Sequence, residues 1–433
     1  MVPRRLCLSS PRARGFFVFV RREPLFHYNG ASAYEDLQSR RGGEIVARTY
    51  EEINEKIRKG EAVVLTADEM TELVSSEGAK KAARKVDVVT TGTFGPMCSS
   101  GAFVNFGHSE PPIKMSKVWL NGVPVCADLA AVDVYIGATA LSESEGMNYG
   151  GAHVIQDFID GKRIKLRSTA YGTDCYPRKE IETWVDKDTV NQAYLFDPRN
   201  AYQNYACATN GSERTIYTYM GVLQPNFGNA TYCSAAQLSP LLNDPLHRTI
   251  GLGTRIFLGG TAGFVAWEGT QHKPTVERSE GGTPVGPAAS LALIGDLKKM
   301  DSRFIRGARF HRYGVSLYVG VGIPIPILDE EMAQYTGVAD SDIVTSVFDY
   351  SQETRSRDPL RRVNYAELRS GSIDINGKKV ATASLSSYKV ARQIAGILKD
   401  WIEAGKFLLS APVEPLPTEG VTLPLEIREE EGN

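Results

Sequence analysis

The first regular pattern of hydrophobic and polar positions along the chain is helical. Thr49 and Glu52 have the spacing of a capping box, in which each side chain bonds the backbone N–H of the other residue. Ile53 and Ile57 follow one helical turn apart. The pattern therefore predicts a helix that begins after Thr49 and ends near residue 59.

Two more helical segments are indicated. A second Thr-x-x-Glu capping box at 66–69 predicts a helix through residue 73, which residues 79–85 extend or restart. The clearest amphipathic pattern covers residues 387–404. Its apolar face consists of Val390, Ile394, Ile397, Leu398 and Ile402.

Between these helices, short β-branched and apolar runs predict strands. They cover residues 86–90, 132–136, 163–169, 249–258 and 315–321, and each runs into glycine or a turn. Strands alternating with helices indicate an α/β fold of one or more mixed sheets with flanking helices. The pattern does not reveal the strand order.

The composition suggests three regions. Residues 1–43 carry eight arginines, no lysine and three acidic residues, so we expect a disordered extension or a misassigned start, with a targeting peptide as the alternative. Residues 44–410 hold the regular patterns and are expected to form the catalytic region, as one large or two tightly packed subdomains. Residues 411–433 are rich in proline and end in acidic residues, so we expect a loose tail.

Charge and hydropathy exclude several function classes. The 433 residues are 42% hydrophobic and 23% charged with a net charge of -2, which suits a globular protein and gives no basic surface for nucleic acid. The longest apolar runs are interrupted by Gly, Arg or Pro and are too short for a membrane span. Six scattered cysteines do not form a disulfide framework, so we expect a reducing, cytoplasmic setting.

Cys175 is the first candidate for chemistry. It lies in the turn after the predicted strand 163–169, where reactive groups are often displayed. Arg178 and Lys179 would favour the nucleophilic thiolate, whereas the adjacent Asp174 opposes it. From the residues alone, a small buried hydrophobic cysteine is the alternative.

Cys98 lies in a similar place, in a loop of small residues after the strand 86–90. A thiol that carries sulfane sulfur needs a second thiol or an external reductant, so two such cysteines suggest a pair. We expect Cys98 and Cys175 to face one pocket, with simple packing of Cys98 as the alternative. The other three cysteines are expected to be structural: Cys126, Cys207 and Cys233. No cysteine or histidine spacing fits a metal cluster.

A carboxylate ligand has two candidate binding regions. Glycines at 259–263 follow a predicted strand, so their N–H groups could hold an anion. The segment 197–204 is polar and flanked by aromatic residues, which suits a pocket wall as well as an ordinary surface loop. The substrate-binding candidates are Arg178, Arg199, Asn200, Gly259, Gly260 and Gly263.

Five motifs add a resemblance to these patterns. They are TFGPMCSSGAFVNFGHSEPPIKM (93–115), TAYGTDCYPRKE (169–180), DPRNAYQNY (197–205), GTRIFLGGTAGFVAWEGTQH (253–272) and VGIPIPIL (321–328). Together they resemble the homocysteine-biosynthesis family of methanogens and other anaerobes, from about residue 49 to about residue 408.

The resemblance implies a sulfurtransferase that acts on L-aspartate semialdehyde and makes homocysteine. It implies a persulfide on Cys175 and a partner role for Cys98. Some relatives carry ferredoxin-like modules or use a separate ferredoxin-like subunit, so the resemblance also implies a low-potential iron-sulfur partner as the electron source. No cofactor is expected in this chain, and the oligomeric state stays open, with a homo-oligomer as one possibility.

The implied reaction agrees with the chemistry of the residues. Conversion of an aldehyde carbon into a thiol carbon consumes one sulfur and two electrons, and the chain has no flavin, nicotinamide or cluster motif to supply them. The alternatives are a non-catalytic sulfur carrier or redox subunit, and a nucleotide- or cobalamin-type binding module. The extent of the α/β scaffold and the candidate carboxylate sites favour the enzyme.

Overall fold

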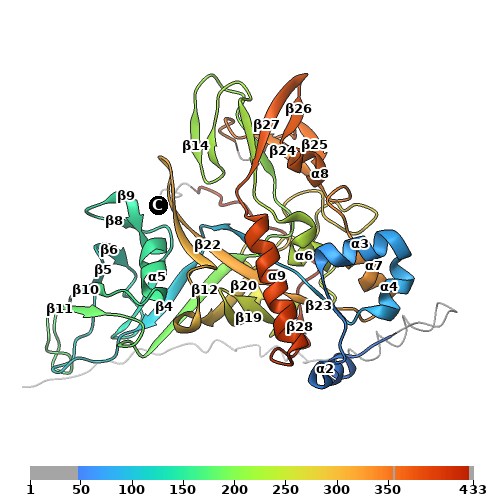
Figure 1. Cartoon of the computed structure of the whole chain (residues 1–433). Helices are drawn as coiled ribbons and strands as arrows, with labels where there is room; N and C mark the ends of the chain where they lie inside the picture. The colour runs from blue at the N-terminus through green and yellow to red at the C-terminus, as the bar shows by residue number, and fades with distance from the viewer. Residues whose placement is uncertain (1–46, 355, 429–433) are drawn as a thin grey trace, which may run out of the picture. The chain divides into compact units, whose positions relative to one another are not determined.

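The computed structural model describes residues 47–354 and 356–428. The predicted extension at 1–43 lies outside them. The described region is built on an antiparallel nine-stranded sheet with the order β21-β22-β18-β19-β20-β12-β4-β7, in which β3 also pairs with β22 (Figure 1). Its strands are β3 (Thr93–Met97), β4 (Gly101–Asn105), β7 (Asp133–Gly137), β12 (Gln192–Asn200), β18 (Arg255–Leu258), β19 (Thr261–Glu268), β20 (Leu291–Asp296), β21 (Ile305–Phe310) and β22 (Gly314–Gly322).

A four-stranded antiparallel sheet, β11-β10-β5-β6, adjoins β7 through a bridge between Cys126 and Tyr135. Its strands are β5 (Lys117–Leu120), β6 (Val123–Val125), β10 (Ile164–Thr169) and β11 (Glu180–Val185). Along β10, Ile164, Leu166 and Ser168 are buried and the residues between them are exposed. Because successive side chains of a strand point to opposite faces, one face of this sheet covers the core.

A mixed six-stranded sheet has the order β25-β24-β13-β16-β27-β26, and β13 with β24 and β16 with β27 are its parallel pairs. Its strands are β13 (Cys207–Thr209), β16 (Asn229–Tyr232), β24 (Val344–Asp349), β25 (Arg361–Asn364), β26 (Ser372–Ile375) and β27 (Lys378–Ser384). The smaller sheets contain β1 (Val64–Thr66), β2 (Val88–Thr90) and β23 (Pro324–Pro326); β14 (Ile216–Thr218) and β15 (Gly221–Leu223); β17 (Gly251–Leu252) and β28 (Glu414–Pro415); and β8 (Leu141–Ser142) and β9 (Gly146–Gly150).

Helices cover the sheets where their apolar faces can be buried. The long helix α9 packs on β22, β3 and β1 through Ala391, Ile394, Leu398 and Ile402, and it crosses the nine-stranded sheet in Figure 1. Helix α5 packs on β21 and β22. The helices are α2 (Tyr50–Lys59), α3 (Ala67–Glu77), α4 (Ala79–Lys85), α5 (Gly151–Ile159), α6 (Pro240–Asn243), α7 (Glu330–Thr336), α8 (Tyr365–Arg369) and α9 (Tyr388–Glu403), with the 3-10 turns η1 (Ala236–Leu238) and η2 (Leu297–Lys299).

The α/β class with mixed sheets is confirmed, and so are the capped helices. Thr49 with Glu52 and Thr66 with Glu69 form both predicted capping boxes, and 79–85 restarts as a separate helix. One expectation about loops is wrong in part. Cys98 lies in a turn, as expected, but the residues on both sides of the turn are strands, because β3 pairs with β22 and β4 pairs with β12 and β7.

The expected loose tail is also wrong for its first part. Glu414 and Pro415 pair with β17, and the side chain of Leu416 is buried. The backbone oxygen of Pro417 lies 3.1 Å from Nε2 of His272. The aliphatic side chains farther along are exposed: Val421, Leu423, Leu425 and Ile427.

Candidate active site

A cavity of about 990 Å³ opens beside the turn between β3 and β4 that carries Cys98. This volume lies near the upper end of the range for small-molecule sites. Its wall combines the turn after β3, the end of β12, the β14–β15 hairpin, the end of β24 and the segment 271–288. The polar and sulfur-bearing side chains at the wall include Cys98, Ser99, Arg199, Tyr202, Tyr205, Tyr217, Tyr219, Cys233, Lys273, Tyr313, Tyr350, Glu353 and Arg357.

Strand pairing fixes the position of Cys98. Met97 pairs with Leu317 across β3 and β22, and the sulfur of Cys98 consequently lies 3.3 Å from the hydroxyl oxygen of Ser316. The hydroxyl of Tyr313 is a second hydrogen-bonding neighbour of this sulfur. Burial, and then the proximity of Cys98, raises the pKa of Tyr313 to about 12. Tyr313 therefore keeps its proton near neutral pH and can donate it in a hydrogen bond to the sulfur.

Arg199 reaches the same cavity from a bulge in β12. The pairing of β12 with β20 shifts between Asp197 and Asn200, which leaves one extra residue in β12. Bulges re-aim side chains and are frequent beside active sites. The Asn200 amide donates to Asp197 Oδ2 at 2.6 Å and so braces the bulge.

A chain of tyrosines forms another part of the wall. The hydroxyl of Tyr205 donates to that of Tyr219 at 3.3 Å, and the hydroxyls of Tyr219 and Tyr350 lie 3.2 Å apart. Burial raises the pKa values of Tyr205 and Tyr350 above the usual tyrosine range. Tyr205 and Tyr350 therefore stay protonated near neutral pH and do not act as bases.

Cys175 lies on a separate, exposed loop between β10 and β11. The loop is closed by a backbone hydrogen bond from Ala170 to Lys179 at 2.7 Å. Arg178 donates to the carbonyl oxygens of Glu110 and Pro111 at 2.8 and 2.9 Å. Arg178 therefore fastens this loop to the segment that follows β4.

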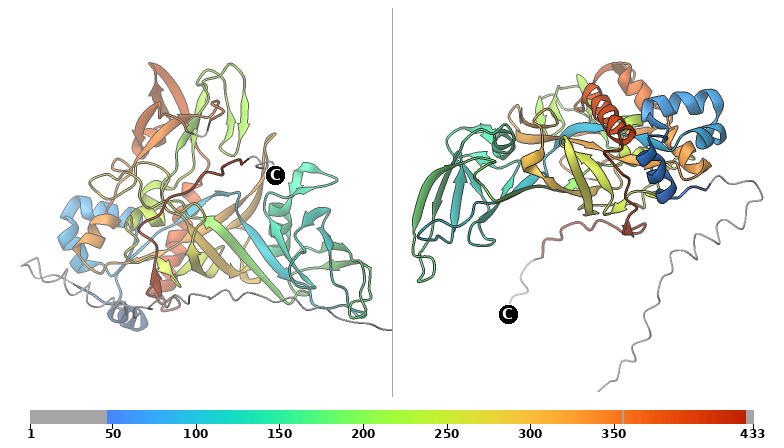
Figure 2. Two further views of the ribbon diagram at one scale, coloured as in Figure 1. Left: turned by 180° about the vertical axis from the view of Figure 1, so that it is seen from behind. Right: turned by 60° about the horizontal axis from the view of Figure 1, so that its bottom comes forward.

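The structure does not bring Cys98 and Cys175 into one cavity, contrary to the expectation from sequence. Cys98 precedes β4, whereas the Cys175 loop contacts residues that follow β4. A strand of five residues spans about 13 Å, so the length of β4 separates the two places. Figures 1 and 2 show the β10–β11 hairpin at one end of the nine-stranded sheet, away from β14 and β24.

The other candidate carboxylate-binding residues have defined places outside the cavity wall. Gly259 and Gly260 have φ values of 60° and 98° and form the tight turn between β18 and β19. The Gly259 N–H donates to the carbonyl oxygen of Gly320 at 2.8 Å. Gly263 packs on Leu258, and Asn200 is buried in the bulge. Of the six candidates, Arg199 is the one at the cavity wall.

The remaining cysteines differ from one another. Cys207 is fully buried, and burial raises its pKa to about 12. Cys233 lies at the cavity wall, and its pKa is raised to about 11, mainly by burial. Sequence reasoning missed this position because its neighbours, Tyr232 and Ser234, carry no charge. Cys126 is exposed.

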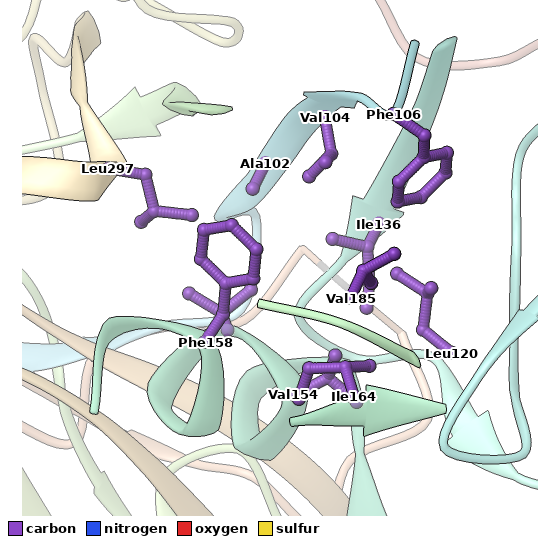
Figure 3. Close-up of a pocket in the computed structure, with 11 residues that line it drawn as sticks. Ala102, Val104, Phe106, Leu120, Ile136, Val154, Phe158, Ile164, Val185 and Leu297 are labelled. Atoms are coloured by element: carbon purple, nitrogen blue, oxygen red, sulfur yellow. The ribbon is translucent and has the colours of Figure 1, made fainter. Parts of the chain in front are cut away.

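A second cavity, of about 10 Å³, lies between α5, β4 and the four-stranded sheet (Figure 3). Its side chains are all apolar, among them Ala102, Ile136 and Phe158. A space this small, with no polar group, is a packing gap rather than a substrate site.

Within residues 47–354 and 356–428, no three His, Cys, Asp or Glu side chains gather as a metal ion would require. No helix in this part of the chain is both long and apolar enough to cross a bilayer.

Comparison with known proteins identifies the family. A family model described as "Homocysteine biosynthesis enzyme, sulfur-incorporation" matches residues 62–409. The chain belongs to this family. The match covers every element that builds the cavity wall from β3 to Arg357. No solved structure matches the chain.

Two curated members of the family carry the name L-aspartate semialdehyde sulfurtransferase. The protein of Methanosarcina acetivorans is 54% identical over 376 residues, which cover 87% of this chain and 73% of the relative. The protein of Methanocaldococcus jannaschii is 51% identical over 387 residues, which cover 86% of this chain and 74% of the relative. An uncharacterized protein of Methanothermobacter thermautotrophicus is 31% identical over 336 residues, which cover 75% of this chain and 73% of the relative.

Proposed function

We propose that this protein makes L-homocysteine from L-aspartate semialdehyde as a cytoplasmic sulfurtransferase, through a cysteine persulfide. The observation that carries the proposal is the cavity itself. It offers a thiol, hydroxyl donors and cationic side chains at one wall, as an aldehyde with a carboxylate requires. The names of the two relatives with more than half of their aligned residues identical support the choice of substrate.

The reaction needs electrons as well as sulfur. Counted from sulfide, the aldehyde RCHO, H₂S, two electrons and two protons give the thiol RCH₂SH and water. The outer sulfur of a persulfide is two electrons more oxidised than sulfide, so counted from the persulfide CysSSH the reaction takes four electrons and four protons and gives CysSH, RCH₂SH and water. The persulfide sulfur adds to the aldehyde carbon, two electrons break the S–S bond, and two reduce the former carbonyl carbon as its oxygen leaves as water. We propose a ferredoxin-like iron-sulfur protein as the electron donor.

In this proposal Cys175 takes up sulfur as a persulfide and Cys98 is its partner. The exposure of Cys175 supports the first role, because a sulfur donor or a protein partner can reach it without opening the structure. Exposure also suits a sulfur carrier with no reaction of its own, which is the second candidate function. The cavity at Cys98 favours the enzyme, since a carrier needs no substrate pocket.

One assay separates these functions. Purified protein is incubated with L-aspartate semialdehyde, a sulfane sulfur donor and a low-potential reductant, and homocysteine is measured by mass spectrometry. We expect homocysteine with the wild type and with Cys126→Ser, whose side chain is also exposed, but none with Cys175→Ser. Persulfide on Cys175 without homocysteine would support the carrier and overturn the enzyme.

A further inference from the structure

The wall of the cavity carries an excess of positive charge. Three cationic side chains and one carboxylate line it: Arg199, Lys273, Arg357 and Glu353. A cavity partly shielded from water strengthens the attraction between such groups and a negative ligand. The natural occupant is therefore a small anion.

Arg199 differs from the other two cations in being both partly buried and unpaired. Among the described residues, its guanidinium has no hydrogen-bond or ion-pair partner. Arg357, by contrast, donates to the backbone oxygens of Thr354 and Gln352 and lies over the ring of Tyr350. Lys273 is exposed. A half-buried guanidinium is costly without a counter-charge, and a carboxylate can bind its planar fork in two places.

Arg199 is also tied to Cys98 through the residue that follows it. The hydroxyl of Ser99 donates to the carbonyl oxygen of Arg199 at 2.6 Å. The bulge in β12 and the turn that holds Cys98 are thus joined at the cavity wall. In a four-carbon amino acid, three C–C bonds separate the carboxyl carbon from the aldehyde carbon, a distance of roughly 4 Å.

We propose that Arg199 binds the carboxylate of the aldehyde substrate and that the aldehyde carbon lies at Cys98. Cys98, and not Cys175, is then the thiol that contacts the substrate. Cys175 takes up sulfane sulfur at the surface and passes it to the Cys98 thiol by thiol–persulfide exchange, which returns Cys175 to a thiol. The inference rests on the proposed function for the identity of the ligand. The hydroxyl of Tyr313, which lies at the cavity wall beside the Cys98 sulfur, is placed to donate to the aldehyde oxygen.

Differential alkylation tests the assignment without turnover. The protein is treated with iodoacetamide, with and without L-aspartate semialdehyde and with no sulfide or reductant, and peptide mass spectrometry gives the alkylation rate of each cysteine. We expect the aldehyde to slow alkylation of Cys98 about tenfold at saturation and to leave the rate at Cys175 within about twofold. Butanal, which lacks the carboxylate, should protect Cys98 only at concentrations about tenfold higher or more.

Substitution of Arg199 adds an independent comparison. Arg199→Met should raise the aldehyde concentration for half-protection of Cys98 about tenfold or more, without changing the unprotected rate. Arg84→Met, which removes an exposed arginine of α4, should keep the wild-type midpoint. If Arg199→Met does not fold, the comparison of L-aspartate semialdehyde with butanal on the wild-type protein tests whether the carboxylate contributes to binding.

Protection of Cys175 in place of Cys98, or equal protection by butanal, would overturn the inference. Failure of the proposed function looks different. Protection of Cys98 without homocysteine formation in the complete assay would leave the binding site intact and reject the sulfurtransferase reaction.

Discussion

The buried carboxyl of Asp197 gives a prediction whose size follows from the structure. Asp197 lies in β12 directly before the bulge and is fully buried. Burial raises its pKa from 3.8 to about 6, although Asn200, Ser100 and the Gly101 N–H offset part of this effect. Ser100 and Gly101 follow Cys98 directly, so the Asp197 carboxyl lies next to the turn that carries Cys98.

The effect on stability has a definite sign. A carboxyl whose pKa is higher in the folded than in the unfolded state holds its proton longer when folded, so its contribution to stability is complete below pH 3.8 and is lost as the pH rises through about 6. At about 1.4 kcal/mol for each pH unit, the difference between 3.8 and about 6 amounts to about 3 kcal/mol. Of this, about 2 kcal/mol falls between pH 4.5 and pH 8.

Asp197→Asn removes this titration and keeps the side-chain shape. We expect the free energy of unfolding of the wild type to fall by about 2 kcal/mol more than that of the variant between pH 4.5 and pH 8. Reversible urea unfolding at both pH values measures it. The contributions of other groups, such as His247, cancel in this difference. The exposed Asp358, changed to Asn, controls for the loss of one negative charge.

Equal pH dependence in the wild type and Asp197→Asn would refute the reasoning. It would mean that water reaches the carboxyl or that the bulge opens when the charge forms. A larger slope in the variant would reverse the sign and would exclude a raised pKa.

Four further predictions concern the two candidate cysteines, the loop that carries Cys175 and the N-terminal residues 1–43. Cys175→Ser should abolish homocysteine formation, because an alcohol cannot hold sulfane sulfur; activity within about tenfold of wild type, or about 1.4 kcal/mol in the barrier, would contradict the persulfide role. Cys98→Ala should still load persulfide on Cys175, seen as a mass increase of one sulfur atom, but should form homocysteine poorly. Arg178→Met should loosen the Cys175 loop and raise its backbone hydrogen exchange, because two bonds to the segment 110–111 are lost. Removal of residues 1–43 should leave the melting temperature and turnover unchanged; a large fall in either would show that this segment packs on the core.

Local patterns predicted the elements whose formation depends on neighbouring residues. Both N-terminal helices begin at their capping boxes, and α9 begins directly after its N-cap Ser387, within the predicted range. A cap and a helical face involve residues three or four positions apart, so they can be read from sequence. The turn that displays Cys175 follows β10 as expected, for the same reason.

Strands were missed where pairing with distant segments decides them. The stretch around Cys98 has glycine and proline and was expected to be a loop; Cys98 does lie in a turn, but β3 and β4 form on either side because β22 and β12 supply partners from distant parts of the chain. The glycines at 259–263 were candidates for binding an anion. In the structure Gly259 and Gly260 turn one strand into the next, and the Gly259 N–H is engaged by Gly320.

The sequence by itself determined the family, the helix boundaries and the two candidate cysteines, since these depend on local patterns and on motifs. Only the tertiary structure decided what each cysteine faces. Strand pairing sets Cys98 opposite Ser316, and the β12 bulge carries Arg199 to the same cavity, whereas β4 holds the Cys175 loop at its other end. Such neighbours are separated by 100 residues or more along the chain, as Ser99 and Arg199 are, and only long-range pairing brings them together.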